Sequence, residues 1–127
     1  MRTGTIVIDG EEHLLCFSLR VMQKCTEQFG SVEKIDEALE DDDQWKEFEN
    51  SIWILAAMME GADRYAKKKG IKNADPLSVE DIYDLMDLNE LGLIKESIFK
   101  TISDGSITTV EVEPPKNQET TQVKETA

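Results

Sequence analysis

The chain has 127 residues, of which 39% are hydrophobic and 32% charged, enough to fill the core of one modest domain. Acidic residues outnumber basic ones 27 to 14, which gives a formal net charge of −13. This charge disfavours nucleic acids and anionic membrane surfaces as partners, because both attract clustered lysine and arginine.

The chain also lacks the sequence signals of a secreted or membrane protein. Its longest apolar run, residues 52–59, is far shorter than the roughly 20 residues of a membrane-spanning helix. Residues 1–15 have neither the basic region nor the long apolar stretch of a secretory signal peptide. Two cysteines are too few for a disulfide framework in a domain of this size. We therefore expect a cytoplasmic protein in which Cys16 and Cys25 are reduced and buried.

Residues 6–17 carry the pattern of a β-hairpin. An apolar run leads into Asp9-Gly10, a dipeptide favoured in tight turns because glycine takes positive φ without penalty. The returning strand, about residues 11–17, has one face with Leu14 and Cys16 and the other with His13, Leu15 and Phe17. Because an isolated hairpin is marginally stable, we expect this one to pack against helices.

Two abutting helices are predicted next. Ser18 is a suitable N-cap for the first, and Gly30 is a suitable C-terminal stop. Its apolar periodicity, with Val21 and Cys25 alongside, is carried by Leu19, Met22, Thr26 and Phe29. Ser31 is expected to cap the second helix, whose inward residues are Val32, Ile35 and Leu39.

Three successive aspartates, Asp41–Asp43, precede the following helix. A calcium loop spaces its oxygen ligands at alternating positions, with a glycine and a distal glutamate, and none of that spacing is present. We interpret the aspartates as negative charge placed at a helix N-terminus, opposite the helix dipole. No metal site is expected here.

A long central helix is predicted from about Gln44 to Lys69, with Gly70 as its cap. Lysines in its last turn complement the helix dipole. Helical spacing is shown by Trp45, Phe48, Ile52, Leu55 and Met59, continued by Ala62 and Ala66. Its centre is apolar around most of its circumference, so other elements must surround it.

The aromatic and methionine residues of this helix allow two interpretations. They are core residues, or part of the strip stays exposed as a pliable groove for a partner, because methionine adapts to varied surfaces. The candidate interaction residues are Trp45, Trp53, Met58, Met59 and Tyr65. A helix this apolar in a small domain also fits contact with a second copy, so homo-oligomerisation is kept as an alternative.

Two more helices and a polar tail complete the chain. Ser78 with Asp81 forms an N-terminal capping pattern, and the helix that follows carries Val79, Ile82, Leu85 and Met86. The last helix begins near Leu88 or Asn89 and is expected to end at Gly105. Its apolar residues are Leu91, Ile94, Ile98 and Ile102, with Phe99 beside them. Residues 106–127 are rich in polar residues and carry little to bury, which predicts a disordered tail.

No catalytic motif is found. His13 is the only histidine and lies in a predicted strand, so no nucleophile, base and acid can be assembled from sequence spacing. Glycine-rich phosphate loops and paired-cysteine motifs are absent. We therefore expect a protein that is not an enzyme and needs no cofactor or metal. The predicted fold class is α+β: a mainly helical domain, residues 1–105, with an N-terminal hairpin and a flexible tail, residues 106–127.

The order of these features resembles the tail assembly chaperones of long-tailed phages and prophages. A hairpin leads into "LCFSLRVMQKCTEQFGSVEKIDEAL", a long helix contains "ILAAMMEGADRYAKKKG", and "PLSVEDIYDLMD", a last helix and an acidic tail follow. The resemblance covers about residues 4 to 105, with "FGSVE" and "LSVED" as landmarks. It implies a non-enzymatic protein of the host cytoplasm, absent from the mature virion. Its partners would be the tape measure protein, whose hydrophobic helices it keeps soluble, and the tail tube protein, which it helps to recruit.

Two other functions fit a small acidic domain without a catalytic motif. An acidic inhibitor that mimics nucleic acid would carry carboxylates on a single face, spaced like phosphates, whereas here they are distributed over several helix starts. The other is a small bacterial regulatory adaptor without a viral role. Both stay as alternatives to the chaperone.

Overall fold

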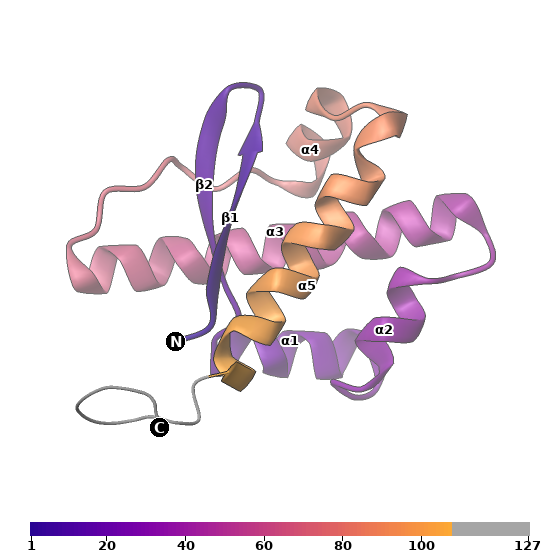
Figure 1. The fold of residues 1–127 in the computed structure, drawn as a ribbon, viewed down its shortest axis with the longest axis horizontal. Helices are drawn as coiled ribbons and strands as arrows, with labels where there is room; N and C mark the ends of the chain where they lie inside the picture. Colours follow the sequence, from indigo (N-terminus) through magenta and orange to yellow (C-terminus); the bar gives the residue numbers. More distant parts are fainter. Residues whose placement is uncertain (108–127) are drawn as a thin grey trace.

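The computed structural model describes residues 1–107, with side chains through Asp104 (Figure 1). A two-stranded antiparallel hairpin is followed by five α-helices and one 3-10 turn, which confirms the predicted fold class. The elements are β1 (Thr3–Ile8), β2 (Glu11–Cys16), α1 (Leu19–Phe29), α2 (Lys34–Leu39), α3 (Gln44–Lys69), α4 (Val79–Leu85), η1 (Leu88–Glu90) and α5 (Leu91–Ile107). The predicted disordered tail lies outside the described residues, except for residues 106 and 107.

Helix α3 is the axis around which the other elements pack (Figure 1). Strand β2 contacts α3, β1 contacts α5, and α5 also contacts α3, so the hairpin is enclosed by the two longest helices. Helices α1 and α2 cover another side of α3, and α4 also packs against α3 (Figure 1). Because α3 is surrounded in this way, its centre, including Ile54, Leu55 and Met58, is fully buried.

The hairpin turn has the geometry that its sequence predicts. Asp9 and Gly10 both have positive φ, 53° and 81°, as a type I′ turn requires. The register pairs Ile8 with Glu11 next to the turn and Thr3 with Cys16 at the far end. In β1 the residues Ile6 and Ile8 are buried, so this strand presents one face to the core.

The helix boundaries follow local capping chemistry. Ser18 accepts a hydrogen bond from the Val21 N–H at 3.3 Å, and α1 ends at Gly30, as expected. The predicted bounds of α3 are confirmed, and its C-cap, Gly70, has the left-handed φ of 68° that favours glycine. The capping box at Ser78 and Asp81 is also present.

Two predicted boundaries are wrong. Ser31 does not cap α2: the N-cap is Glu33, and the Ser31 carbonyl instead accepts from the Lys34 N–H at 3.2 Å in a turn before the helix. The chain reverses direction after α1 through a turn at residues 31–33, so α2 begins only at Lys34. Gly105 does not end α5, which continues to Ile107 because glycine is tolerated inside a helix at a modest energetic cost.

The predicted inward face of α1 is wrong at two positions, Leu19 and Thr26. Its fully buried residues are Val21 and Cys25, four positions apart, whereas Leu19 is 82% exposed and Thr26 is exposed. Leu19 and Thr26 therefore lie on the outer side of the helix, whereas Met22 and Phe29 are partly buried against the core. Helix α1 therefore packs against α3 through Val21 and Cys25 along its length and through the Phe29 ring, which contacts Trp53, at its C-terminal end.

Candidate functional site

An apolar groove opens between the first turns of α3 and the segment from α4 to η1, and we call it the α3–α4 groove. Its volume is about 220 Å³, below the roughly 300–1,000 Å³ of typical small-molecule pockets. It is lined by Trp45, Phe48, Ile52, Ile82, Tyr83, Met86, Asp87 and Leu88. A groove of this size and composition suits one or two apolar side chains inserted from another protein.

The first wall of the groove is defined by the start of α3. Asp43 is the N-cap, and its Oδ1 accepts hydrogen bonds from the N–H groups of Trp45 at 2.9 Å and Lys46 at 3.4 Å. Asp41 accepts from the Asp43 N–H at 2.9 Å and so orients the cap itself. The predicted role of the aspartates at this helix start is therefore confirmed for Asp43. The cap fixes where α3 begins and, with it, the position of Trp45.

The second wall is set by two successive capping boxes. In α4 the Ser78 Oγ accepts from the Asp81 N–H, and the Asp81 carboxylate accepts from the Ser78 N–H, both at 3.1 Å. The second capping box begins at Asp87, directly after Met86, whose backbone is extended. There the Asp87 carboxylate accepts from the Leu88 N–H at 2.6 Å, and Glu90 accepts from the Asp87 N–H at 2.7 Å. These local bonds turn the chain and place Leu88 at the end of the groove.

The lining separates into a buried floor and an exposed rim. Phe48, Ile52 and Ile82 are buried and form the floor. The rim consists of large apolar side chains that remain exposed: Trp45 at 69%, Leu88 at 56% and Tyr83 at 40%. The rings of Trp45 and Phe48 are in contact, with centroids 5.7 Å apart. Large side chains gathered around one hollow are typical of a protein-interaction site.

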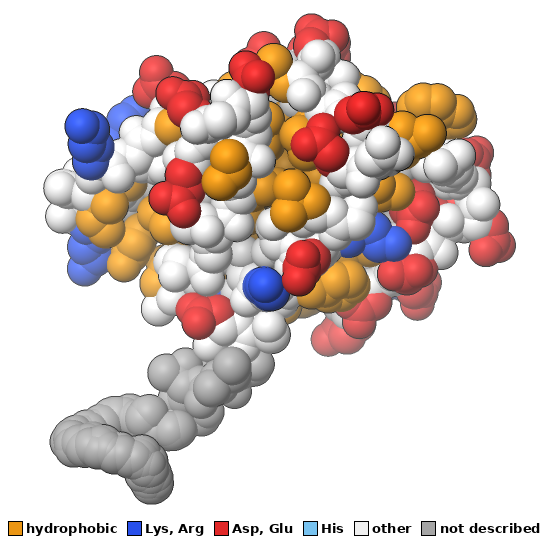
Figure 2. Space-filling model, turned by 45° about the horizontal axis from the view of Figure 1, so that its top comes forward, with side chains coloured by type: hydrophobic (Ala, Val, Ile, Leu, Met, Phe, Trp, Pro, Cys, Tyr) orange, Lys and Arg blue, Asp and Glu red, His pale blue; other side chains and the backbone are white. Residues whose placement is uncertain are grey.

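The surroundings of the groove are acidic. Asp87 is the one charged residue among the described residues that line it. The pKa of the Tyr83 hydroxyl is raised, first by burial and then by the negative charges of Glu49 and Glu80, so both carboxylates act on this rim. On the face of the molecule in Figure 2, hydrophobic side chains lie between acidic ones. A cationic partner is therefore favoured at this surface.

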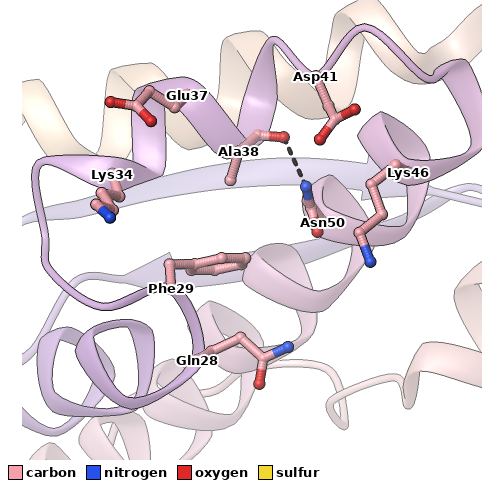
Figure 3. Close-up of a pocket in the computed structure, with 8 residues that line it drawn as sticks. All are labelled: Gln28, Phe29, Lys34, Glu37, Ala38, Asp41, Lys46 and Asn50. Atoms are coloured by element: carbon pink, nitrogen blue, oxygen red, sulfur yellow. Dashed lines mark hydrogen bonds between the residues drawn. The ribbon is translucent and has the colours of Figure 1, made fainter.

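A second hollow, of about 360 Å³, lies between the end of α1, α2 and the start of α3 (Figure 3). It is lined by Gln28, Phe29, Lys34, Glu37, Ala38, Asp41, Lys46 and Asn50. The Asn50 side chain donates to the Ala38 carbonyl at 2.9 Å and so ties α3 to α2. The lining mixes charges of both signs and includes no serine, cysteine or histidine among the described residues, so it offers no hydroxyl or thiol nucleophile beside an imidazole base.

The structure separates the five residues expected to form an interaction surface. Trp45 lies on the rim of the α3–α4 groove, whereas Met58 and Met59 are buried in the core and are not available to a partner in this conformation. Trp53 is partly buried and packs edge-to-face on Phe29, with ring centroids 5.4 Å apart. Tyr65 is partly buried and does not line the groove. Of the five, only Trp45 belongs to the candidate site.

Sequence reasoning missed two rim residues, Tyr83 and Leu88. Spacing alone could not have found Tyr83, because it lies four residues after Val79 and three before Met86, as compatible with the apolar face as the buried Ile82. No local signal places Leu88 beside Trp45. The two residues are 43 positions apart and meet only because α4 packs on α3.

Both cysteines are buried and free, as predicted. Burial raises the pKa of the Cys25 thiol to about 11 and also raises that of Cys16. Within residues 1–107 no group of three or more histidine, cysteine, aspartate or glutamate side chains is placed to hold a metal ion. In the same part of the chain, no helix has both the length and the apolar character needed to cross a membrane.

No protein-family model, curated protein or solved structure matches this chain.

Proposed function

We propose that this protein is a non-enzymatic tail assembly chaperone of a long-tailed phage or prophage. It acts in the host cytoplasm, where it binds the tape measure protein, keeps its hydrophobic helices soluble and helps to recruit tail tube subunits. The resemblance in feature order supports this assignment.

The α3–α4 groove is the observation that carries the proposal. It offers a client helix a buried apolar floor and a rim of Trp45, Tyr83 and Leu88, without requiring the domain to unfold. Docking of an amphipathic helix into an apolar groove is a common mode of peptide recognition. The excess of 27 acidic over 14 basic residues would help to keep a complex with a hydrophobic client in solution.

The experiment that tests this function is co-expression of the full chain with the tape measure protein of the same phage or prophage. We expect the soluble fraction of the tape measure protein to increase and the two proteins to elute together in size-exclusion chromatography. The proposal fails if the tape measure protein is equally insoluble with and without this chain and no complex elutes. Recovery of a nucleic-acid-binding enzyme with this chain, and no tape measure protein, would favour an acidic inhibitor.

A further inference from the structure

The walls of the α3–α4 groove determine how a partner can bind there. They are formed by helical segments of α3, α4 and η1, and no β-strand lies among the described residues that line the groove. The groove therefore presents no strand edge to which an extended peptide could add. A partner must dock through its side chains alone, as an amphipathic helix does with apolar residues spaced three and four positions apart.

The charges around the groove determine the polarity of that helix. Asp87 lines the groove, and Glu49 and Glu80 act electrostatically on Tyr83 at its rim. The nearby Lys46 lies 3.4 Å from Glu49 but lines the other hollow (Figure 3). Acidic side chains therefore outnumber basic ones around the apolar rim, and a complementary helix carries lysine or arginine beside its apolar stripe.

Two other occupants fit less well. Residues 108–127 of this chain contain four glutamates and two lysines, and their neighbouring valines, Val110 and Val112, are each followed by a glutamate. A second copy of the chain carries the same net charge of −13. Both would bring negative charge to an acidic rim, which Coulomb repulsion opposes.

We propose that the α3–α4 groove binds an amphipathic client helix whose apolar side chains insert between Trp45, Tyr83 and Leu88 and whose flanking lysines or arginines face Glu49, Glu80 and Asp87. This inference builds on the proposed function, in that the client is the tape measure protein. It adds the binding site and the chemistry that selects the client segment.

A peptide titration tests the chemistry directly. In full-length protein carrying Trp53→Phe, Trp45 is the only tryptophan, so its emission reports on the groove. The probes are synthetic helices of about 18 residues, long enough to be helical in water. One has a leucine stripe flanked by lysines, one has the same stripe flanked by glutamates, and one has the lysine peptide's composition in scrambled order.

We expect the lysine-flanked peptide to shift the Trp45 emission to shorter wavelength and to bind at least about tenfold more tightly than the other two. Its affinity should fall as salt is raised, because exposed charge pairs are screened. Equal binding of all three peptides, or no change in Trp45 emission, overturns the proposal. Calorimetry on the protein with both tryptophans gives the same comparison if Trp53→Phe impairs folding.

Matched variants locate the site. Trp45→Ala and Leu88→Ser should each weaken binding of the lysine-flanked peptide by about tenfold or more, because truncation of buried interface anchors has effects of this size. Glu49→Gln combined with Glu80→Gln should flatten the salt dependence. The controls are Leu19→Ser, which changes an exposed leucine on α1, and Glu27→Gln, which removes an exposed charge there. If the controls weaken binding as much as the groove variants, the peptide adsorbs to the acidic surface in general and the proposal is wrong.

The outcomes for the groove and for the chaperone function can be told apart. If Trp45→Ala and Leu88→Ser proteins still co-elute with the tape measure protein, the groove is not the client site and the chaperone function stands. If the wild-type chain binds the lysine-flanked peptide in the groove but not the tape measure protein, the chaperone function fails and the inferred chemistry stands. Dimerisation of the chain alone, abolished by Leu88→Ser in sedimentation, would make a second copy the occupant and overturn the proposal.

Discussion

Gly61 in α3 lies so close to Val21 in α1 that a Cβ atom at Gly61 would be 2.6 Å from the Val21 Cγ2. Such an atom would also lie 3.3 Å from the Cys16 Sγ. Val21 is β-branched and restricted at χ1 in a helix, so it cannot easily turn away. The close approach of α1, β2 and α3 at this point therefore depends on the missing side chain.

We expect Gly61→Ala to destabilise the protein by up to about 2 kcal/mol, because overpacking costs roughly 1–3 kcal/mol and the gain in helix propensity offsets about 1. Urea unfolding followed by circular dichroism measures the change. Gly92→Ala is the matched control: a Cβ atom there meets nothing within 4 Å, and we expect a gain of about 0.5–1 kcal/mol. Equal stabilisation by both substitutions would contradict the close packing.

Lys95 joins α5 to α3 and to the end of α2 through contacts with two carboxylates. Its Nζ lies 2.7 Å from Glu47 and 3.3 Å from Glu40, and its side chain is mostly shielded from solvent. We expect Lys95→Met to cost about 1.5–3 kcal/mol of unfolding free energy, since it leaves the half-buried Glu47 without its partner. Lys100, in the exposed pair with Glu96 at 3.3 Å, is the control, and Lys100→Met should change stability by less than about 0.5 kcal/mol. Similar losses of unfolding free energy in Lys95→Met and Lys100→Met would show that the pair with Glu47 stabilises the fold no more than the exposed pair with Glu96 does.

The same ion pair predicts a pH dependence at high pH. The hydrogen bond to Glu47 raises the pKa of Lys95 above its ordinary value of 10.5, although burial opposes the shift. Because the folded-state pKa is the higher one, the stabilisation is fully present below pH 10.5 and is lost as pH rises through the raised pKa. From about pH 7, where carboxylates are ionised, up to pH 10.5 the stability difference between wild type and Lys95→Met should therefore be constant, and above pH 10.5 it should shrink. If the stability difference grows above pH 10.5, the pKa of Lys95 is lowered in the folded protein and not raised.

His13 is buried in β2 without a hydrogen-bond partner. The side chain is 1% exposed, and neither ring nitrogen has a partner among the described residues. The nearest acid, Glu11, has an oxygen 3.9 Å from Nε2, too far for a hydrogen bond. A neutral imidazole carries one donor and one acceptor, and burying both unpaired is costly. Replacement by an apolar side chain of similar size should therefore stabilise the fold.

We expect His13→Leu to raise the unfolding free energy by about 1 kcal/mol, measured by urea denaturation. Glu11→Gln is the control for the 3.9 Å contact and should have little effect, because that residue is exposed. If His13→Leu lowers stability while Glu11→Gln is neutral, the imidazole makes a favourable interaction that its geometry does not reveal.

The two cysteines should be unreactive in the folded protein. The thiolate is the reactive form, and burial raises the pKa of Cys25 to about 11 and raises that of Cys16 as well. At pH 8 we expect a thiol-specific disulfide reagent to modify neither cysteine until the protein opens, and to modify both at once in denaturing urea. Rapid reaction of one equivalent in native buffer would show that Cys16 or Cys25 is accessible.

The sequence by itself determined where most elements begin and end. The caps at Ser18, Asp43 and Ser78 and the stop at Gly70 act within a few residues of their own positions. The Asp9-Gly10 turn is equally local. For this reason the hairpin and the bounds of α3 were predictable from spacing alone. Ser31 does not cap α2 because the chain reverses direction directly after α1, so residues 31–33 form a turn and the helix begins after them.

Only the tertiary structure decided which sides of those elements face the core. Leu19 and Trp45 fit the apolar periodicity of their helices, yet both are exposed because nothing described packs over them. Trp45, Tyr83 and Leu88 come together because α4 and η1 fold back onto the start of α3. Burial is a property of what surrounds a side chain, and that depends on contacts between residues far apart in the chain, which no local pattern encodes.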